Sequence, residues 1–191
     1  MQPFPIILAS MSPRRKQLLE MIDLEFKTTP SSIQENLNIN MTPENIVQHY
    51  AKEKSLDIAR SYPGFLVIGA DTVVVLKNKI LGKPKNKLES FAMLKSLSGM
   101  THSVYTGVSI HHISHQISLT FYEKTDVSFL KYSDSTISYY IDKYNPLDKA
   151  GSYGIQDWFA INVSKINGCF YNVMGFPLSA FYIHYRQIVN K

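Results

Sequence analysis

The sequence predicts an α/β or α+β fold, with a mixed, strongly twisted sheet flanked by helices, and two patterns carry this prediction. Early in the chain, short apolar runs alternate with amphipathic stretches, which is typical of alternating strands and helices. In the middle, two long extended segments, Ser103 to Ile110 and Gln116 to Phe129, are joined near His111 and His112. With 45% hydrophobic residues, the chain is expected to form a single domain over residues 1–191, with two lobes and a central cleft.

The composition narrows the classes of protein to which the chain can belong. The net charge of +5 suits a small anionic ligand at least as well as nucleic acid. Cys169 is the single cysteine, so an intramolecular disulfide is impossible and a reducing, cytoplasmic compartment is favoured. The segment from Met1 to Pro5 has no basic side chain and does not resemble a signal peptide. No stretch approaches the ~18 apolar residues of a membrane span, so no membrane contact is expected.

A phosphate site is indicated where the first predicted strand, Ile6 to Ala9, gives way to a helix. Ser12 is a good N-cap for this helix. Arg14 and Arg15 follow in the first turn, where two cations oppose the helix dipole. Backbone N–H groups, the hydroxyls of Ser10 and Ser12 and two guanidinium groups would together form a cradle for an anion. The alternative is a solvated helix start.

A further cation, Lys54, falls on the apolar stripe of the helix predicted from Thr42 to about Arg60. Lys54 either extends past the stripe to solvent or borders a cleft and meets an anion there. Before this helix, Phe26 to Ile33 is predicted to be extended, and Glu35 follows it in a polar loop. The stripe consists of residues at helical spacing, namely Ile46, Val47, Tyr50, Ala51 and Ile58.

Asp71 has apolar residues on both sides. It lies between a predicted buried strand, Phe65 to Ile68, and a second apolar run, Val73 to Leu76. Because an isolated buried charge is very costly, this carboxylate must be paired, protonated or bound to a metal. The chain is then predicted to return through a hairpin at Lys77 to Lys79 and to reach Lys83.

Caps and periodicity predict the remaining elements. Asn86, with Glu89 completing a capping box, begins a helix that ends at Gly99, and a further helix covers residues 134–144. The core face of the first of these helices is expected to be Leu88, Phe91, Ala92, Leu94 and Leu97.

The C-terminal part is predicted to contain strands at 161–163 and 165–166, after a polar loop at 147–156 that bears glycines. The last helix starts near Pro177. Its apolar face is expected to be Leu178, Phe181, Tyr182, Tyr185 and Ile188.

Three groups are weaker functional candidates. The three histidines could bind a metal, but an exposed loop between two strands is the preferred interpretation. The cysteine has no histidine nearby, so a structural thiol is preferred to a nucleophile. The aromatic pair could stack on a base or belong to the core. The groups are His111, His112 and His115; Cys169; and Trp158 with Phe159.

The remaining polar residues are typical of phosphoryl and nucleotidyl chemistry. In such sites carboxylates bind a divalent cation and orient or deprotonate water, while Arg and Lys neutralise phosphate charge. Mg²⁺ takes oxygen ligands and usually only one or two carboxylates. The candidates are the cations Arg14, Arg15, Lys54 and Lys83 and the acids Asp71 and Glu35.

Six motifs lie in a fixed order between about residues 6 and 182. They are Leu8-Ala9-Ser10-x-Ser12-Pro13-Arg14-Arg15, Gly69-Ala70-Asp71-Thr72-Val73-Val74, Gly82-Lys83-Pro84, Thr101-His102-x-Val104-x-Thr106-Gly107-Val108, Asp148-Lys149-Ala150-Gly151-x-Tyr153-Gly154-Ile155-Gln156 and Ile166-x-Gly168-x-x-x-Asn172-Val173-x-Gly175-x-Pro177-Leu178. Together they resemble the Maf family of nucleotide pyrophosphatases.

This resemblance implies hydrolysis of a nucleoside triphosphate between the α and β phosphates. It also implies a divalent cation (Mg²⁺ or Mn²⁺), an inosine-triphosphatase-like fold and a possible homodimer. By motif match, Asp71 would be the catalytic acid or base and, with Glu35, a metal ligand. The phosphates would be bound by Ser10, Arg14, Arg15, Lys54 and Lys83.

The resemblance also implies a base preference. The subgroup that acts on dTTP and UTP carries Arg, Thr and Gln at three points, matched here by Arg14, Thr72 and Gln156. A pyrimidine substrate, including uridine triphosphates modified at C5, is therefore implied, and the role would be to prevent incorporation of unwanted nucleotides. Gln156 offers one donor and one acceptor group, which suits the O4 and N3–H edge of uracil or thymine.

Three other functions stay open from the residues. A 7-methyl-GTP pyrophosphatase is one, although Thr72 and Gln156 argue against it. A nucleotide-binding regulator of cell division or septum formation, with little turnover, is another, and nucleic-acid binding is the third. The chain also departs from the family pattern. Asp157 to Ala160 replaces a segment where many members have glycines, and Gln34 leaves only Glu35 of a frequent carboxylate pair.

Overall fold

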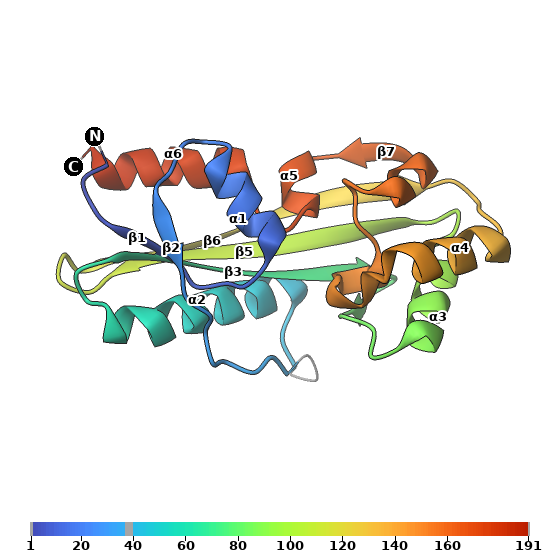
Figure 1. Cartoon of the computed structure of the whole chain (residues 1–191), viewed down its shortest axis with the longest axis horizontal. Coiled ribbons are helices and arrows are strands. Elements are labelled where there is room, and N and C mark those ends of the chain that lie inside the picture. The colour runs from blue at the N-terminus through green and yellow to red at the C-terminus, as the bar shows by residue number, and fades with distance from the viewer. Residues whose placement is uncertain (1, 37–39, 191) are drawn as a thin grey trace.

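The computed structural model describes residues 2–36 and 40–190, so the expectation about Met1 lies outside the described residues. Within this part of the chain, one mixed sheet of seven strands has the order β2-β1-β3-β5-β6-β7, and β4 pairs with β3 (Figure 1). β1 is parallel to β2 and β3, whereas the other pairs are antiparallel. The strands are β1 (Ile6–Leu8), β2 (Phe26–Thr28), β3 (Leu66–Leu76), β4 (Lys79–Leu81), β5 (Thr101–His112), β6 (Ile117–Phe129) and β7 (Val163–Asn167).

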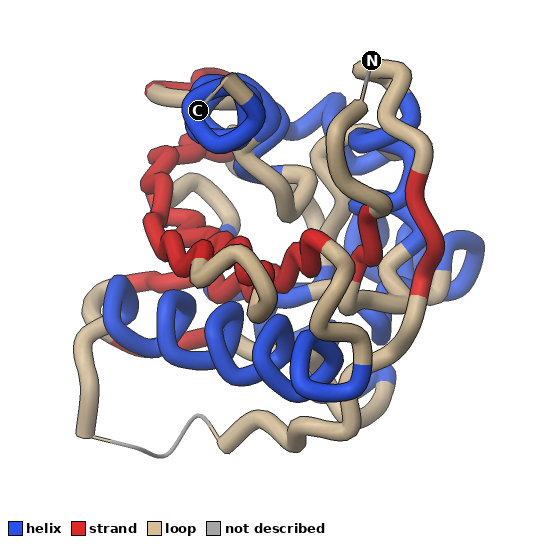
Figure 2. Tube along the Cα trace, turned by 90° about the vertical axis from the view of Figure 1, so that its left-hand side faces the viewer, coloured by secondary structure: helices blue, strands red, loops and turns tan. Residues whose placement is uncertain are grey.

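Helices cover both faces of this sheet, which confirms the predicted fold class. In Figure 1, α2 lies below the long strands β3 and β5, and α1 and α6 lie above them. Figure 2 shows the curvature of the sheet between these layers. The helices are α1 (Pro13–Glu20), α2 (Pro43–Ser61), α3 (Lys87–Leu97), α4 (Asp134–Tyr144), α5 (Phe170–Val173) and α6 (Leu178–Val189), with 3₁₀ turns η1 (Pro146–Asp148), η2 (Ala150–Ser152) and η3 (Trp158–Asn162).

Two glycines let α2 lie directly on the sheet. A Cβ at Gly69 of β3 would come within 2.3 Å of the Ala51 carbonyl oxygen, and one at Gly107 of β5 within 2.2 Å of the Val47 carbonyl oxygen. Since real Cβ atoms do not approach so closely, any side chain at either position would push the helix away. The close packing brings the middle of α2 against the middle of β3, where Asp71 lies.

Most predicted elements are confirmed, with some corrections in extent. β3 is one continuous strand, so Asp71 lies inside it rather than between two strands. The extended segment expected from Phe26 to Ile33 forms a strand only as far as Thr28. A 3₁₀ turn, η3, replaces the strand expected at 161–163, because the Asp157 side chain caps the Phe159 N–H at 3.0 Å.

Five residues were assigned to the wrong environment. Leu88 is 83% exposed and Ala92 is exposed too, because α3 packs through its other face, and Tyr182 on α6 is also exposed. His111 and His112 are buried in β5 rather than in an exposed loop, since the turn begins one residue later at Ile113. The long β5–β6 pairing therefore includes both histidines, and the His111 ring bonds to the Ser55 hydroxyl at 2.7 Å.

No helix in the described part of the chain is both long enough and apolar enough to cross a membrane.

Candidate active site

A cleft of about 380 Å³ opens between the start of α1, the loop before α2, the middle of β3 and the turns that follow α4. The predicted site residues lie together in this cleft, although they come from six separate segments of the chain. The cleft is lined by every one of them, namely Ser10, Arg14, Arg15, Glu35, Lys54, Asp71, Thr72, Lys83 and Gln156.

Lys54 joins the two acids at the floor of the cleft. Its ammonium group donates to Asp71 Oδ1 at 2.6 Å and also to Glu35 Oε1. The Lys54 side chain is only 10% exposed, so it does not extend to solvent. The second Asp71 oxygen, Oδ2, is buried without a hydrogen-bond partner among the described residues.

Burial dominates the electrostatics of this cluster. Burial raises the pKa of Asp71 to about 6, the nearby Glu35 charge acts in the same direction, and Lys54 opposes both. Partial burial, the largest single cause, would raise the pKa of Glu35. The attraction and hydrogen bond of Lys54, together with smaller contributions from Lys83 and Asp71, outweigh it, so the pKa is lowered. Asp71 is thus a carboxyl group that can gain or lose a proton near neutral pH, which suits a general base.

Arg15 contributes a guanidinium group whose acceptors among the described residues are all neutral. It donates to the Gly175 carbonyl at 2.9 Å, to the Thr72 hydroxyl at 3.1 Å and to the Ser10 hydroxyl at 3.3 Å. Burial lowers its pKa, against the attraction of Asp71 and Glu35, but guanidinium stays protonated in proteins. A cation held in place without a direct ion pair is prepared for an incoming anion.

Ser12 occupies the N-cap position of α1, but its side chain makes no capping bond in the described structure. Instead, the Ser12 backbone N–H donates to the Ser10 hydroxyl at 3.2 Å. Ser10 therefore links the turn before α1 to Arg15, through its bonds to the Ser12 N–H and to the guanidinium group.

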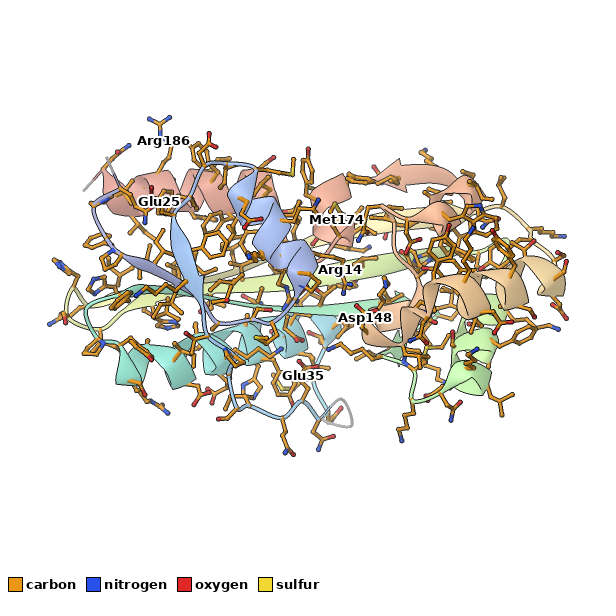
Figure 3. All side chains as sticks on the ribbon, viewed as in Figure 1. Arg14, Glu25, Glu35, Asp148, Met174 and Arg186 are labelled. Atoms are coloured by element: carbon orange, nitrogen blue, oxygen red, sulfur yellow. The ribbon has the colours of Figure 1, made fainter. Side chains whose placement is uncertain are left out.

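Arg14 extends to the opposite side of the cleft. Its guanidinium group binds Asp148 Oδ2 at 2.7 Å, and Asp148 Oδ1 accepts from Lys149 at 2.8 Å. In Figure 3, Arg14, Asp148 and Glu35 lie near the middle of the molecule, where α1, η1 and the loop before α2 converge. Arg14 and Arg15 thus differ in environment: Arg15 is fixed inside the site, whereas Arg14 bridges the cleft.

Lys149, Asp148 and Tyr153 line the cleft but were missed as site residues. They belong to the fifth motif, from which only Gln156 was assigned a role. The polar residues of this loop do not recur at the spacing of a helix or a strand. Only the family motif could therefore have identified these three residues as site residues. Tyr153 adds an apolar ring to the cleft and donates to or accepts from buried His102 at 2.7 Å.

The weaker candidates lie outside the cleft. Phe159 is fully buried and packs with its ring 4.6 Å from that of Tyr140, and Trp158 stacks on the same cluster, so this aromatic pair belongs to the core. Cys169 and the three histidines do not line the cleft. Among the described residues, no group of three or more His, Cys, Asp or Glu could hold a metal by itself.

A model of the Maf-like protein family matches residues 5–188 of this chain. The chain belongs to the Maf family. A dTTP/UTP pyrophosphatase of Thermosipho melanesiensis is 51% identical over 174 residues, which cover 91% of this chain and 92% of the relative. One from Bacillus mycoides is 45% identical and covers 91% and 90%.

One solved structure is also similar, although weakly. It is the crystal structure of a nucleoside-triphosphatase / dITP/XTP pyrophosphatase from Mycobacterium abscessus, with 9% identity and a TM-score of 0.42. The match covers 68% of this chain and 76% of that one. The seven-stranded sheet and its flanking helices define the fold class of this Maf-family chain.

Proposed function

We propose that this Maf-family chain hydrolyses dTTP and UTP to the nucleoside monophosphate and pyrophosphate. Two relatives with this name share 45% and 51% of the aligned residues over nine-tenths of the chain. The structural observation that carries the proposal is the cluster of Asp71, Lys54 and Glu35 at the floor of a cleft lined by two arginines. Such a cluster combines a base with the cations that a triphosphate requires.

Asp71 is the base of the proposed reaction. At pH 7 its carboxylate is largely ionised because the pKa is about 6. It would accept a proton as water attacks the α-phosphorus, while the bond from that phosphorus to the oxygen bridging it to the β-phosphorus breaks. One water is consumed, and pyrophosphate leaves. Ser10, Arg15 and Lys83 would bind the phosphate oxygens and neutralise the charge that gathers on the leaving group.

The donor set fits a divalent cation, Mg²⁺ or Mn²⁺. Asp71 Oδ2 is a buried oxygen without a partner among the described atoms, and Glu35 lies across Lys54 from Asp71. Mg²⁺ commonly binds through one or two carboxylates plus phosphate oxygens and water. When bound, the ion would polarise the phosphate oxygens and make water more acidic.

The far side of the cleft is suited to a base. Gln156 is exposed and lines the cleft, and apolar side chains such as Val104 and Met174 line it too. The amide can offer a donor and an acceptor to the O4 and N3–H edge of uracil or thymine. Because the C5 position lies off this edge, uridine triphosphates modified at C5 are also expected substrates.

A substrate panel tests the proposal. Pyrophosphate release is measured with UTP, dTTP, CTP, GTP, ATP and 7-methyl-GTP, in Mg²⁺ or Mn²⁺, for the native chain and for Asp71→Asn. We expect release from UTP and dTTP, and a loss of about 10²–10⁴-fold in the variant, which removes a general base. Thermal unfolding of the variant serves as the control for folding.

Each alternative predicts another result, either in this panel or in a binding measurement with nucleotides, DNA or RNA. Preference for 7-methyl-GTP would replace the pyrimidine proposal, and tight nucleotide binding without release would indicate a regulator of cell division. Salt-dependent affinity for DNA or RNA would indicate a nucleic-acid protein. We include three further points in this proposal. They are a homodimer, a cytoplasmic location and the removal of unwanted nucleotides from the nucleotides available in the cell.

A further inference from the structure

The turn that carries Gln156 is held from behind by a buried tyrosine. Tyr140 comes from α4, and its side chain is fully buried. Its hydroxyl accepts from the Gly154 backbone N–H at 3.1 Å and donates to Asp157 Oδ2 at 2.8 Å. One hydroxyl therefore joins the residues on both sides of the Ile155–Gln156 pair.

Asp157 closes the turn with further bonds. Its Oδ1 accepts from the Phe159 N–H at 3.0 Å, which starts η3, and its own N–H donates to the Gly154 carbonyl at 3.4 Å. The carboxylate lies directly under Gly154, where a Cβ would come within 2.3 Å of Oδ2. A side chain at position 154 would therefore expel the carboxylate that closes the turn.

Aromatic packing fixes the tyrosine that supports the turn. The Tyr140 ring stacks on Tyr144, with centroids 5.3 Å apart, and lies 4.6 Å from Phe159. Burial, followed by the nearby Asp157 charge, raises the pKa of Tyr140, so its hydroxyl stays protonated and can donate. The anchor of the turn is thus rigid, although Gln156 itself is exposed in the cleft.

Rigidity at this point has a chemical consequence. A glutamine amide has a donor at one end and an acceptor at the other, and cytosine presents to it the reverse of the pattern on uracil. An amide that can meet the base edge equally well in both orientations satisfies either base. Selectivity therefore requires that Gln156 reach the edge from one fixed backbone position, at which only one amide orientation gives good hydrogen-bond geometry.

We propose that Tyr140 and Asp157 are positioning residues that hold Gln156 and so set the preference for uracil over cytosine. This inference rests on the proposed function. It identifies two residues outside the cleft that determine the base preference of the proposed enzyme. Neither residue lines the cleft, so both act through the turn rather than by touching substrate.

The decisive variant is Tyr140→Phe, which removes one oxygen and keeps the ring packing. We expect the ratio of kcat/KM for UTP to kcat/KM for CTP to fall at least tenfold, with a rise in KM for UTP and little change in kcat. The matched control is Tyr144→Phe, since the described structure shows no hydrogen bond from the Tyr144 hydroxyl. An unchanged ratio in Tyr140→Phe would overturn the proposal.

A double-mutant cycle separates positioning from a general loss of structure. In a Gln156→Ala background, Tyr140→Phe should no longer alter the UTP-to-CTP ratio. A change of the same size in both backgrounds would mean that Tyr140 acts elsewhere, which contradicts the proposal. Should Tyr140→Phe not fold, Asp157→Asn gives a second test. Its amide has only one acceptor oxygen, so it cannot accept from both the Tyr140 hydroxyl and the Phe159 N–H.

Hydrogen exchange gives a readout that is independent of activity. The amides of residues 154–160 should exchange faster in Tyr140→Phe, while those of β3 stay unchanged. Failure of the proposed function would look different, since the native chain would then release no pyrophosphate from UTP at all. Release by the native chain with unaltered selectivity in the variants would refute the positioning role alone.

Discussion

The two walls of the cleft are built in different ways. The first wall consists of Ser10, Arg15, Lys54, Asp71 and Thr72, which are carried by strands, by helices or by the short turn between β1 and α1. The second wall, residues 148–156, consists of 3₁₀ turns and the segment after them.

The walls also differ in how far their ion pairs are exposed to solvent. On the first wall, the ion pair of Lys54 with Asp71 is almost excluded from water, with side chains 10% and 4% exposed. On the second wall, Asp148 is 54% exposed where it meets Arg14 and Lys149. Breaking a buried ion pair leaves an uncompensated charge and is costly, whereas an exposed pair contributes little. We therefore expect the first wall to carry the chemistry and the second to adjust affinity and base choice.

The largest expected effect follows from Lys54→Met on the first wall. The variant leaves Asp71 and Glu35 facing each other without a cation, so we expect kcat/KM for UTP to fall by about 10²–10³-fold. The free energy of unfolding should fall by about 3 kcal/mol, the lower end for breaking a buried pair, because Asp71 can take up a proton. Pyrophosphate release and urea unfolding measure the two effects.

Lys149→Met on the second wall is the matched control. Its partner Asp148 is half exposed, so the same substitution should change stability by less than about 1 kcal/mol. If Lys54→Met and Lys149→Met lowered the free energy of unfolding equally, the proposed difference between the two walls would be wrong. A double variant, Lys54→Met with Asp71→Asn, should regain stability but not activity.

A smaller effect is expected from pH. Asp71 acts as a base only when ionised, and burial raises its pKa to about 6. Log kcat/KM should therefore rise with a slope near one as the pH increases toward 6 and become flat above about pH 7. Lys54 lowers the pKa of Asp71, so any residual profile of Lys54→Met should be displaced to higher pH. A flat profile between pH 5 and 8 would contradict the role of Asp71.

The smallest effect is expected from Asp148→Asn, which weakens the bridge to Arg14 across the cleft. We expect a change of a few-fold in KM for UTP, an unchanged kcat and a loss of stability below about 1 kcal/mol. Steady-state kinetics at two ionic strengths measures the change in KM. Because salt screens exposed ion pairs, the difference between native chain and variant should be smaller at the higher ionic strength. A large loss of kcat would place Asp148 with the residues of the first wall.

Part of the first wall could be predicted from the residues themselves, because Lys54 and Asp71 lie on periodic elements, whereas Thr72 was assigned through the family resemblance. Spacing of four residues along α2 placed Lys54 with Tyr50 and Ile58, and apolar neighbours marked Asp71 as buried. Which groups pair could not be predicted, since the contact of Lys54 with Glu35 depends on how a loop closes over a helix. The fixed position of Arg15, rather than Arg14, against Thr72 was equally hidden.

The second wall could be found only through the family resemblance. Turns held by side-chain bonds, such as that of Tyr140 with Asp157, join positions 17 residues apart and leave no period in the sequence. The misplaced histidines have a related cause. A hairpin was expected at His111 and His112, but strand pairing continued to His112, and long-range pairing decides where a strand ends.

The charged side chains that line the cleft have a further consequence for turnover. Five are cationic and three are acidic, which gives the lining a net charge of +2 when all are ionised. Such a field draws a triphosphate inward from roughly a Debye length away, about 8 Å at physiological salt. The field does not distinguish the arriving chain of phosphates from the departing pyrophosphate. Emptying the cleft after each reaction therefore works against the same attraction that filled it.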